Sequence, residues 1–236
     1  MYMKKLILIF ICMINGFLMA EVEAQDWANL SRFKEANEKI ASARTCDNRV
    51  VFMGNSITEG WINTVPEFFV EDKQYINRGI GGQTTPQMLL RFRQDVLKLW
   101  PKVVVILAGV NDIAGNTGPS TLEMIEDNLH SMTDLAQARG IQVVLCSVLP
   151  AYEFSWSEVE DPAPKIVELN RRIKEYAAKK GAVYCDFHSQ MSDERNGLPV
   201  ELSGDGVHPN KDGYEIMEPI VENAIARAFL MWKEFK

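Results

Sequence analysis

The sequence predicts an α/β protein in which a parallel sheet lies between two layers of helices. Short apolar segments rich in β-branched residues alternate along the chain with helical segments of about ten to twenty residues. The third apolar segment, residues 102–108 (KVVVILA), is apolar on both faces, as a central parallel strand must be. The length of 236 residues fits one such domain, and a hydrophobic content of 47% supplies a sizeable core.

The individual elements follow from the spacing of apolar residues and from the glycine and polar residues that interrupt it. The predicted strands cover residues 49–53, 75–80, 102–108, 142–148 and 182–187. The predicted helices cover residues 26–40, a short segment after Pro66, and residues 85–97, 121–140, 166–180 and 214–232. A long loop, residues 150–164, separates the fourth strand from the next helix.

The first 24 residues predict an export signal rather than part of the fold. Two lysines precede an almost wholly apolar run, residues 6–19, and small residues up to Ala24 resemble a signal-peptidase site. An uncleaved membrane anchor is less well supported, because the run is shorter than the ~20 residues of a spanning helix and contains Asn15 and Gly16. We therefore expect one domain, residues 25–236, in an exported protein that is periplasmic or secreted.

The composition argues against several functions. The net charge of −7 argues against a nucleic-acid partner, because phosphate binding needs clustered lysine and arginine. Beyond the predicted signal, the odd number of cysteines (Cys46, Cys146 and Cys185) argues against a disulfide framework, and the last two are expected to pack as small buried residues. No cofactor or metal is expected, since the chain contains no HExxH, no CxxC and no phosphate-binding loop.

The stretch around Ser56 is the first candidate for chemistry. Four apolar residues, 50–53, predict a buried strand, and the sequence Gly-Asn-Ser follows. Ligands of open α/β sheets bind just outside the carboxyl ends of the strands, so the Ser56 hydroxyl is a candidate nucleophile. The alternative is that Gly-Asn-Ser only turns the chain and caps the next helix.

Other polar residues are expected at the same edge of the sheet. Gly82 and Asn111 follow the second and third strands, and His208 lies in the loop before the last helix. Together with Ser56 they supply the nucleophile, the base and the oxyanion donors that acyl transfer requires. Asp205 lies three residues before His208, close enough to bond one ring nitrogen and leave the other free as a base.

Four sequence blocks resemble the SGNH hydrolases, also called the GDSL esterase/lipase family. They are GNSITEG at 54–60, GIGGQTT at 79–85, GVND at 109–112 and DGVHPN at 205–210, and they stand in the family's order. The resemblance implies a flavodoxin-like sheet of five parallel strands with helices on both faces.

The resemblance also implies a role for each matched residue. It implies Ser56 as nucleophile, His208 as general base, Asp205 as the acid that orients it, and oxyanion donors from the Ser56 and Gly82 backbones and the Asn111 side chain. Gly82 is preferred to Gly81 because the family's glycine stands two residues before a Ser or Thr, here Thr84. Asn55 stands where the family often has Asp, and this change leaves the mechanism intact.

Three other polar residues near these blocks have simpler explanations. His188 ends the fifth strand and is an alternative base, but it lacks an acidic residue three positions ahead in a loop. Asp112 is expected to bond backbone amides of the Ser56 turn. Glu59 is expected to stabilise a helix N-terminus.

Four aromatic residues are candidates for substrate binding. They are Trp61, next to the first block, and Tyr152, Phe154 and Trp156 in the long loop. The three loop residues either form a wall that faces the substrate or a small cluster under the loop.

These features predict an exported serine esterase that hydrolyses short-chain O-esters, above all acetyl esters, of a carbohydrate. The first and last blocks look most like those of the acetylhydrolase and carbohydrate-esterase branches. The alternatives are a lysophospholipase or thioesterase, which needs a long apolar channel, and a glycan-binding module that has lost catalysis. The expected partner is a small-molecule or glycan ester, with no stable membrane association after signal cleavage.

Overall fold

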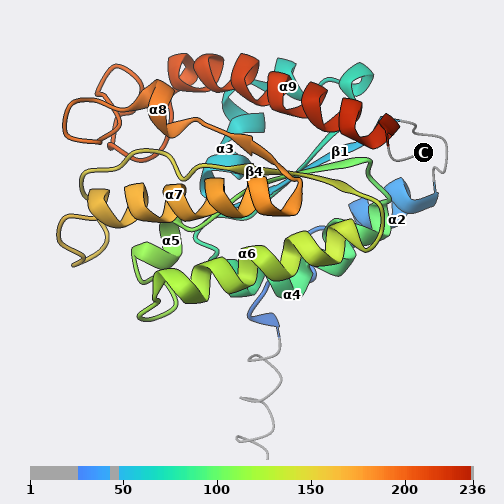
Figure 1. The fold of residues 1–236 in the computed structure, drawn as a ribbon, viewed down its shortest axis with the longest axis horizontal. Coiled ribbons are helices and arrows are strands. Elements are labelled where there is room, and N and C mark those ends of the chain that lie inside the picture. Colours follow the sequence, from blue (N-terminus) through green and yellow to red (C-terminus); the bar gives the residue numbers. More distant parts are fainter. Residues whose placement is uncertain (1–25, 43–47, 235–236) are drawn as a thin grey trace, which may run out of the picture.

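Five parallel strands form the centre of the computed structural model, which describes residues 26–42 and 48–234 (Figure 1). They are β1 (Val50–Gly54), β2 (Tyr75–Gly79), β3 (Val103–Leu107), β4 (Gln142–Cys146) and β5 (Val183–Cys185). Their order in the sheet is β2-β1-β3-β4-β5, and every neighbouring pair is parallel. The predicted fold class is therefore confirmed. The predicted export signal and Cys46 lie outside the described residues.

The position of β1 in the sheet fixes where a site can form. The chain crosses from β1 to β2 on one side and continues with β3 on the other, so the strand order reverses at β1. Gly54, at the end of β1, lies level with Gly79 of β2 and Leu107 of β3. The loops after these three strands consequently leave the same edge of the sheet at the reversal point, where ligands of such sheets bind.

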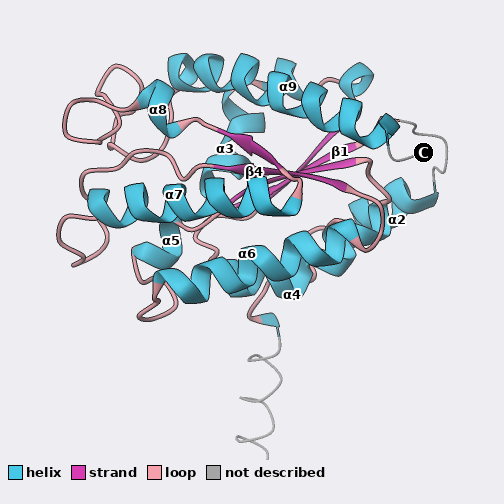
Figure 2. Ribbon diagram, in the orientation of Figure 1, coloured by secondary structure: helices cyan, strands magenta, loops and turns pink. Residues whose placement is uncertain are grey.

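Helices cover both faces of the sheet (Figures 1 and 2), which explains why every residue of β1 and β3 is buried. On one face, α3 (Ser56–Thr64) packs against α9 (Lys211–Glu234). The other carries α4 (Thr85–Asp95), α6 (Leu122–Gln137) and α7 (Ala163–Lys180). Shorter helical segments are α2 (Lys34–Ser42), α5 (Val110–Ile113), α8 (His188–Met191), and the 3₁₀ turns Pro66–Phe69, Glu71–Lys73 and Leu97–Leu99. None of the helices described is long and apolar enough to cross a membrane.

Two predicted helices differ from the observed ones. Residues 26–33 form turns and α2 begins only at Lys34, because the Asp26 carboxylate binds the backbone N–H groups of Leu30 and Ser31 and holds a turn there. The helix expected after Pro66 is a single 3₁₀ turn. The α-helix of this region is α3, which ends two residues before Pro66, and the Asn55 side chain caps it by accepting the Ile57 N–H at 3.1 Å.

Trp61 is part of the core, so the expectation that it binds substrate is wrong. Its side chain is 1% exposed, and its ring stacks on those of Phe68 and Tyr214, with centroids 4.9 and 5.4 Å apart. The physical reason is its place in α3. Residue 61 lies one helical turn after Ile57, another buried residue, and both therefore face the sheet.

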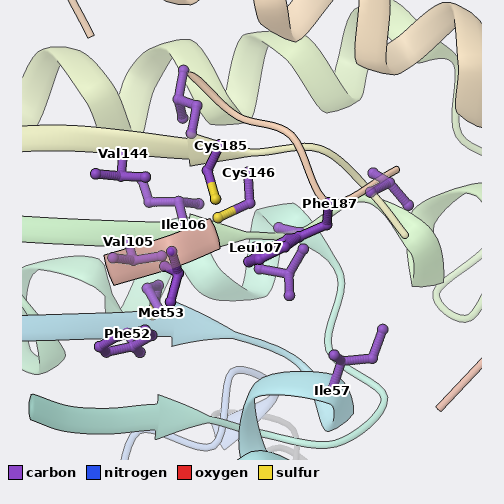
Figure 3. Packing of buried hydrophobic residues seen from close by; sticks show 14 of the residues in the cluster. Phe52, Met53, Ile57, Val105, Ile106, Leu107, Val144, Cys146, Cys185 and Phe187 are labelled. Atoms are coloured by element: carbon purple, nitrogen blue, oxygen red, sulfur yellow. The ribbon is translucent and has the colours of Figure 1, made fainter. Parts of the chain in front are cut away.

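The two cysteines in strands pack as the sequence predicts. Cys146 and Cys185 are register partners on β4 and β5, and both are buried free thiols. Their sulfur atoms point toward one another within the core (Figure 3). Burial raises the pKa of the Cys146 thiol well above its ordinary value, which keeps it uncharged.

We predict that Trp61→Ala lowers the free energy of unfolding by about 3–5 kcal/mol, because the substitution leaves a cavity in the aromatic cluster. Ile62→Ala is the matched control, since the neighbouring side chain is 39% exposed, and its cost should stay below about 1 kcal/mol. Denaturant unfolding followed by circular dichroism measures both. Equal losses for the two variants would contradict the buried position of Trp61.

Candidate active site

Ser56 lies at the junction between β1 and α3. The close approach of the helix to the strand end at this junction requires glycine at position 54. A Cβ atom on Gly54 would lie 2.0 Å from the Thr58 Oγ1 and 2.9 Å from the Leu107 carbonyl oxygen. Without that atom, the first turn of α3 packs directly against the strand end. Ser56 is the first residue of the helix, and the first helical hydrogen bond is the one that Glu59 donates to Asn55. The N–H of Ser56 therefore has no acceptor within the helix.

His208 lies in a tight turn before α9. The Asn210 N–H donates to the Leu202 carbonyl at 2.8 Å, and the Ser203 hydroxyl donates to the carbonyl of His208 at 2.8 Å. The Asn210 side-chain amide also donates to the Glu201 carbonyl at 2.8 Å. These contacts close the turn and fix the direction of the His208 side chain.

A hydrogen bond between α9 and α3 joins two segments at this site that lie far apart in the sequence. The Tyr214 hydroxyl, in the first turn of α9, donates to the Ile57 carbonyl in the first turn of α3 at 2.7 Å. Tyr214 is only 2% exposed. This contact brings His208 to Ser56, although 152 positions separate the two residues along the chain.

Ser56, His208 and Asp205 form a continuous hydrogen-bonded chain. The Ser56 Oγ lies 2.8 Å from the His208 Nε2, and the His208 Nδ1 lies 2.7 Å from the Asp205 Oδ2. An ionised carboxylate only accepts hydrogen bonds, so the proton is on Nδ1 and the lone pair of Nε2 accepts from the serine hydroxyl. This is the tautomer that a general base requires.

Asp205 is held as a carboxylate by its neighbours. Its partial burial raises its pKa, but the backbone and side-chain N–H groups of His208 and the backbone N–H of Val207 outweigh that effect and lower it to about 2. The two backbone donors lie 2.8 and 2.9 Å from Oδ1. The charge that orients His208 is therefore present wherever the pH exceeds about 4.

The loops after β2 and β3 carry the expected oxyanion donors, and the first of these loops approaches Ser56, since a Cβ atom on Gly81 would lie 3.9 Å from the Ser56 Cβ. Gly82 has a φ of +74°, a conformation that side-chain-bearing residues rarely adopt. The N–H of Gly81 already donates to the Glu59 Oε2 at 2.9 Å, which favours the Gly82 N–H as the donor to a substrate. Asn111 in α5 is 3% exposed, and its Nδ2 donates to the Gln83 carbonyl at 3.0 Å, which anchors its amide beside the same loop.

Asp112 and Glu59 make contacts that the sequence did not predict. Asp112 accepts hydrogen bonds from the N–H and the hydroxyl of Thr85, so it binds the start of α4 and not the Ser56 turn. Burial raises its pKa, which the Thr85 donors partly oppose. Glu59 lies in the first turn of its helix, as expected, and also accepts from Gly81 and from Arg32 at 3.2 Å. The contacts of Asp112 with Thr85 and of Glu59 with Gly81 and Arg32 join segments that become neighbours only in the folded chain, so the local sequence did not predict them.

The alternative base, His188, is directed elsewhere. Its Nδ1 lies 3.1 Å from the Ser192 hydroxyl, and its Nε2 is buried without a partner among the described residues. Burial also lowers its pKa, which disfavours the charged form. Among the described histidines, His208 is therefore the one within hydrogen-bonding distance of Ser56.

The long aromatic loop lies beside His208. Phe154 is buried beneath the loop, as the cluster alternative expects, whereas Trp156 and Tyr152 are 42% and 46% exposed. The centroids of the Trp156 and His208 rings are 6.1 Å apart. The Trp156 indole N–H donates to the Asn116 Oδ1 at 3.0 Å, and the Asn116 amide donates to the Gly82 carbonyl at 3.1 Å.

A pocket of about 300 Å³ lies next to Asp205, on the side of the site where the aromatic loop is found. Its lining includes Tyr152, Glu153, Arg195 and Gly204. The Arg195 guanidinium lies 5.0 Å from the centre of the Tyr152 ring. Sequence reasoning missed Arg195 and Asn116, since neither belongs to a motif and only the folded loops bring them to the site.

Comparison with known proteins agrees with this geometry. Residues 52–216 match the model of the GDSL-like Lipase/Acylhydrolase family. The chain belongs to this family. The crystal structure of a GDSL-like lipase from Bacteroides thetaiotaomicron shares 46% sequence identity, covers 85% of this chain and 98% of that chain, and has a TM-score of 0.82. Membership places the protein among GDSL-like esterases and acylhydrolases and confirms the family resemblance found in the sequence.

Two curated relatives are more distant and longer. An acetylxylan esterase from Xylanibacter ruminicola is 26% identical over 213 residues, which cover 75% of this chain and 43% of that protein. The lipoprotein YqeF of Bacillus subtilis is 27% identical over 154 residues, which cover 64% of this chain and 59% of that protein. The chain thus spans about half the length of these two relatives.

We predict that the Asp205 carboxylate favours the folded state in a pH-dependent way. Its folded-state pKa of about 2 is below the ordinary value of 3.8, so the contribution is present above about pH 4 and is lost as the pH falls through about 2. The difference in unfolding free energy between the wild type and Asp205→Asn should therefore narrow over that interval. Urea unfolding at several pH values measures this free-energy difference. If it is the same at about pH 5 and about pH 2, the lowered pKa of Asp205 in the folded state is contradicted.

Proposed function

We propose that the protein is an exported serine esterase that removes short acyl groups, above all acetyl, from carbohydrate hydroxyls. The observation that carries the proposal is the unbroken sequence of hydrogen bonds from Ser56 to His208 to Asp205, at 2.8 and 2.7 Å, at the edge where the strand order reverses. Ser56 acts as the nucleophile, His208 as the general base, and Asp205 orients the imidazole and stabilises its charged form.

Acylation begins when the Ser56 Oγ attacks the carbonyl carbon of the ester and the His208 Nε2 accepts the serine proton. The carbonyl oxygen becomes an oxyanion, which the N–H groups of Ser56 and Gly82 and the Asn111 amide stabilise. The position of Ser56 at the N-terminus of α3 adds the positive end of the helix dipole. The tetrahedral intermediate then collapses, and His208 returns the proton to the departing alcohol oxygen.

Deacylation repeats these steps with water as the nucleophile. His208 removes a proton from a water molecule that attacks the acyl carbon, and the resulting oxyanion occupies the same donors. When the bond to Ser56 breaks, the serine oxygen recovers the proton from His208, and the free acid leaves. The side chains of His208 and Asp205 are 40% and 44% exposed, so water reaches this side of the site.

The surroundings of His208 support a carbohydrate as the alcohol. The leaving alcohol receives its proton from His208, so the rest of the alcohol lies on the side of Trp156 and Tyr152. Exposed aromatic rings beside a polar pocket are suited to the apolar faces and the hydroxyls of a sugar. The similarity to an acetylxylan esterase and to a lipoprotein supports a glycan substrate and export.

The decisive experiment measures acetate release from nitrophenyl acetate and from acetylated xylan. We predict that Ser56→Ala reduces kcat by at least ~10³-fold without unfolding the protein, because it removes the nucleophile. Ser131→Ala, which removes an exposed hydroxyl on α6, is the matched control and should retain full activity. Activity that survives Ser56→Ala would overturn the mechanism, and an inactive wild type would favour the glycan-binding module.

We further predict that Trp156→Ala separates glycan esters from small esters. KM for an acetylated xylo-oligosaccharide should rise about 10-fold or more, since a stacked aromatic contact is lost, while KM for nitrophenyl acetate changes little. The control is Trp100→Ala, a residue that is 67% exposed and precedes β3 at the opposite edge of the sheet. Nitrophenyl esters of increasing chain length complete the test, and activity that rises beyond butyrate would favour the lipase-like alternative.

A further inference from the structure

A buried arginine connects the strand that leads to Ser56 with the loop that carries Gly82. The Arg91 side chain, on α4, is 0% exposed. Its Nη2 donates to the Gly54 carbonyl at 3.0 Å, its Nε donates to the Gln83 Oε1 at 2.6 Å, and its Nη1 pairs with Asp95 at 3.1 Å. One guanidinium therefore holds the end of β1 and the residue after Gly82 at a fixed separation.

Gln83 supports two of the expected oxyanion donors at once. It directly follows Gly82, and its backbone carbonyl accepts the hydrogen bond from the Asn111 amide at 3.0 Å. Its side chain is 3% exposed and is held at both ends, because Oε1 accepts from Arg91 and Nε2 donates to the Ala28 carbonyl at 2.8 Å. A displacement of Gln83 would consequently move both Gly82 and Asn111.

A second contact holds Gly82 from its other side. The N–H of Gly81 donates to the Glu59 Oε2 at 2.9 Å, and the Glu59 Oε1 accepts from Arg32 at 3.2 Å. Glu59 lies in the first turn of α3, three residues after Ser56. The two neighbours of Gly82 are thus fixed independently, one by Glu59 and one by Arg91.

The segment before β1 completes both contacts, although it precedes the residues that match the family model. Ala28 and Arg32 bind Gln83 and Glu59 as described, and Asn37 of α2 donates to the Asp95 Oδ1 at 2.6 Å. Asn37 also accepts from the Arg78 Nε at 2.9 Å. Figure 1 shows this segment, in blue, running next to α4, which α2 contacts.

A buried charge makes this arrangement rigid. Moving the loop away from Arg91 would leave its buried Nε–H without an acceptor, although Asp95 and the Gly54 carbonyl would still bind the rest of the guanidinium. An unsatisfied donor on a buried charged group costs more than a lost neutral contact. Oxyanion donors stabilise a transition state only if they are in position before the reaction, and a misplacement of about 1 Å can reduce the rate ~10²-fold.

We propose that Arg91, Gln83 and Glu59 are positioning residues for the oxyanion donors, and that residues 26–42 act through them as part of the catalytic scaffold. The inference rests on the proposed function, because it concerns stabilisation of the same oxyanion. It adds a role for a segment that carries no catalytic group of its own.

The test compares two glutamines that both donate to backbone carbonyls of the N-terminal segment. Gln83 donates to Ala28, and Gln94 donates to Leu30 at 2.5 Å without contacting the Gly82 loop. Gln83→Met should reduce kcat for nitrophenyl acetate about 10–100-fold with KM changed less than about twofold. Gln94→Met should leave both constants unchanged.

A transition-state mimic separates positioning from general destabilisation. A boronic acid that forms a tetrahedral adduct with Ser56 should bind the Gln83→Met protein more weakly by about the same factor as kcat falls, whereas product inhibition by acetate should not change. Both are measured at a temperature where circular dichroism shows the variants to be folded.

A second pair covers the case in which Gln83→Met does not fold. Glu59→Ala removes a partly exposed ion pair that holds Gly81, and Glu222→Ala removes the comparably exposed pair with Lys73, remote from the site. Glu59→Ala should lower kcat and boronate affinity together by about 5–50-fold, and Glu222→Ala should lower neither.

The outcomes also distinguish this inference from the proposed function. If the wild type hydrolyses esters through Ser56 and the folded Gln83 and Glu59 variants keep kcat within about twofold of their controls, only the positioning role is overturned. If the wild type is inactive, or Ser56→Ala remains active, the proposed function fails and this inference fails with it.

Discussion

The hydrogen bond from Tyr214 to the Ile57 carbonyl is the contact on which the site depends most directly. It joins the first turn of α9 to the first turn of α3, and it is buried against Trp61 in the aromatic cluster. The parallel sheet delivers Ser56, Gly82 and Asn111 to one edge, but His208 comes from a loop with no strand beside it. The packing of α9 on α3 is what brings His208 to Ser56.

The site divides into a buried half and an exposed half, which suits the two tasks of ester hydrolysis. Asn111, Gln83 and Arg91 are each at most 3% exposed, so the supports of the proposed oxyanion donors are rigid and largely shielded from water. His208 and Asp205 are about two-fifths exposed, so the proton-transfer side is open to the alcohol and to water. Preorganised donors gain strength in a low-dielectric environment, whereas proton transfer to a departing alcohol needs access.

Motif residues serve packing as much as chemistry. Gly54 allows the helix of Ser56 to approach the strand end, and Asn55 caps that helix, so the interpretation of Gly-Asn-Ser as a turn and cap is compatible with its role in presenting the serine. Asp112 of the third block likewise binds the start of α4. The spacing within each block therefore reflects how a strand, a loop and a helix fit together locally.

The sequence by itself determined the parallel sheet, its strand positions, and the residues that meet at its edge, because strand periodicity and short motifs are local properties. The tertiary structure decided the rest. It buried Trp61, where a sequence pattern shows only an aromatic residue after a motif, and it directed Asp112 to Thr85. It also assembled Arg91, Gln83 and Ala28 into one support, since a buried arginine finds its partners among segments that are distant in the chain and become neighbours only when the helices pack.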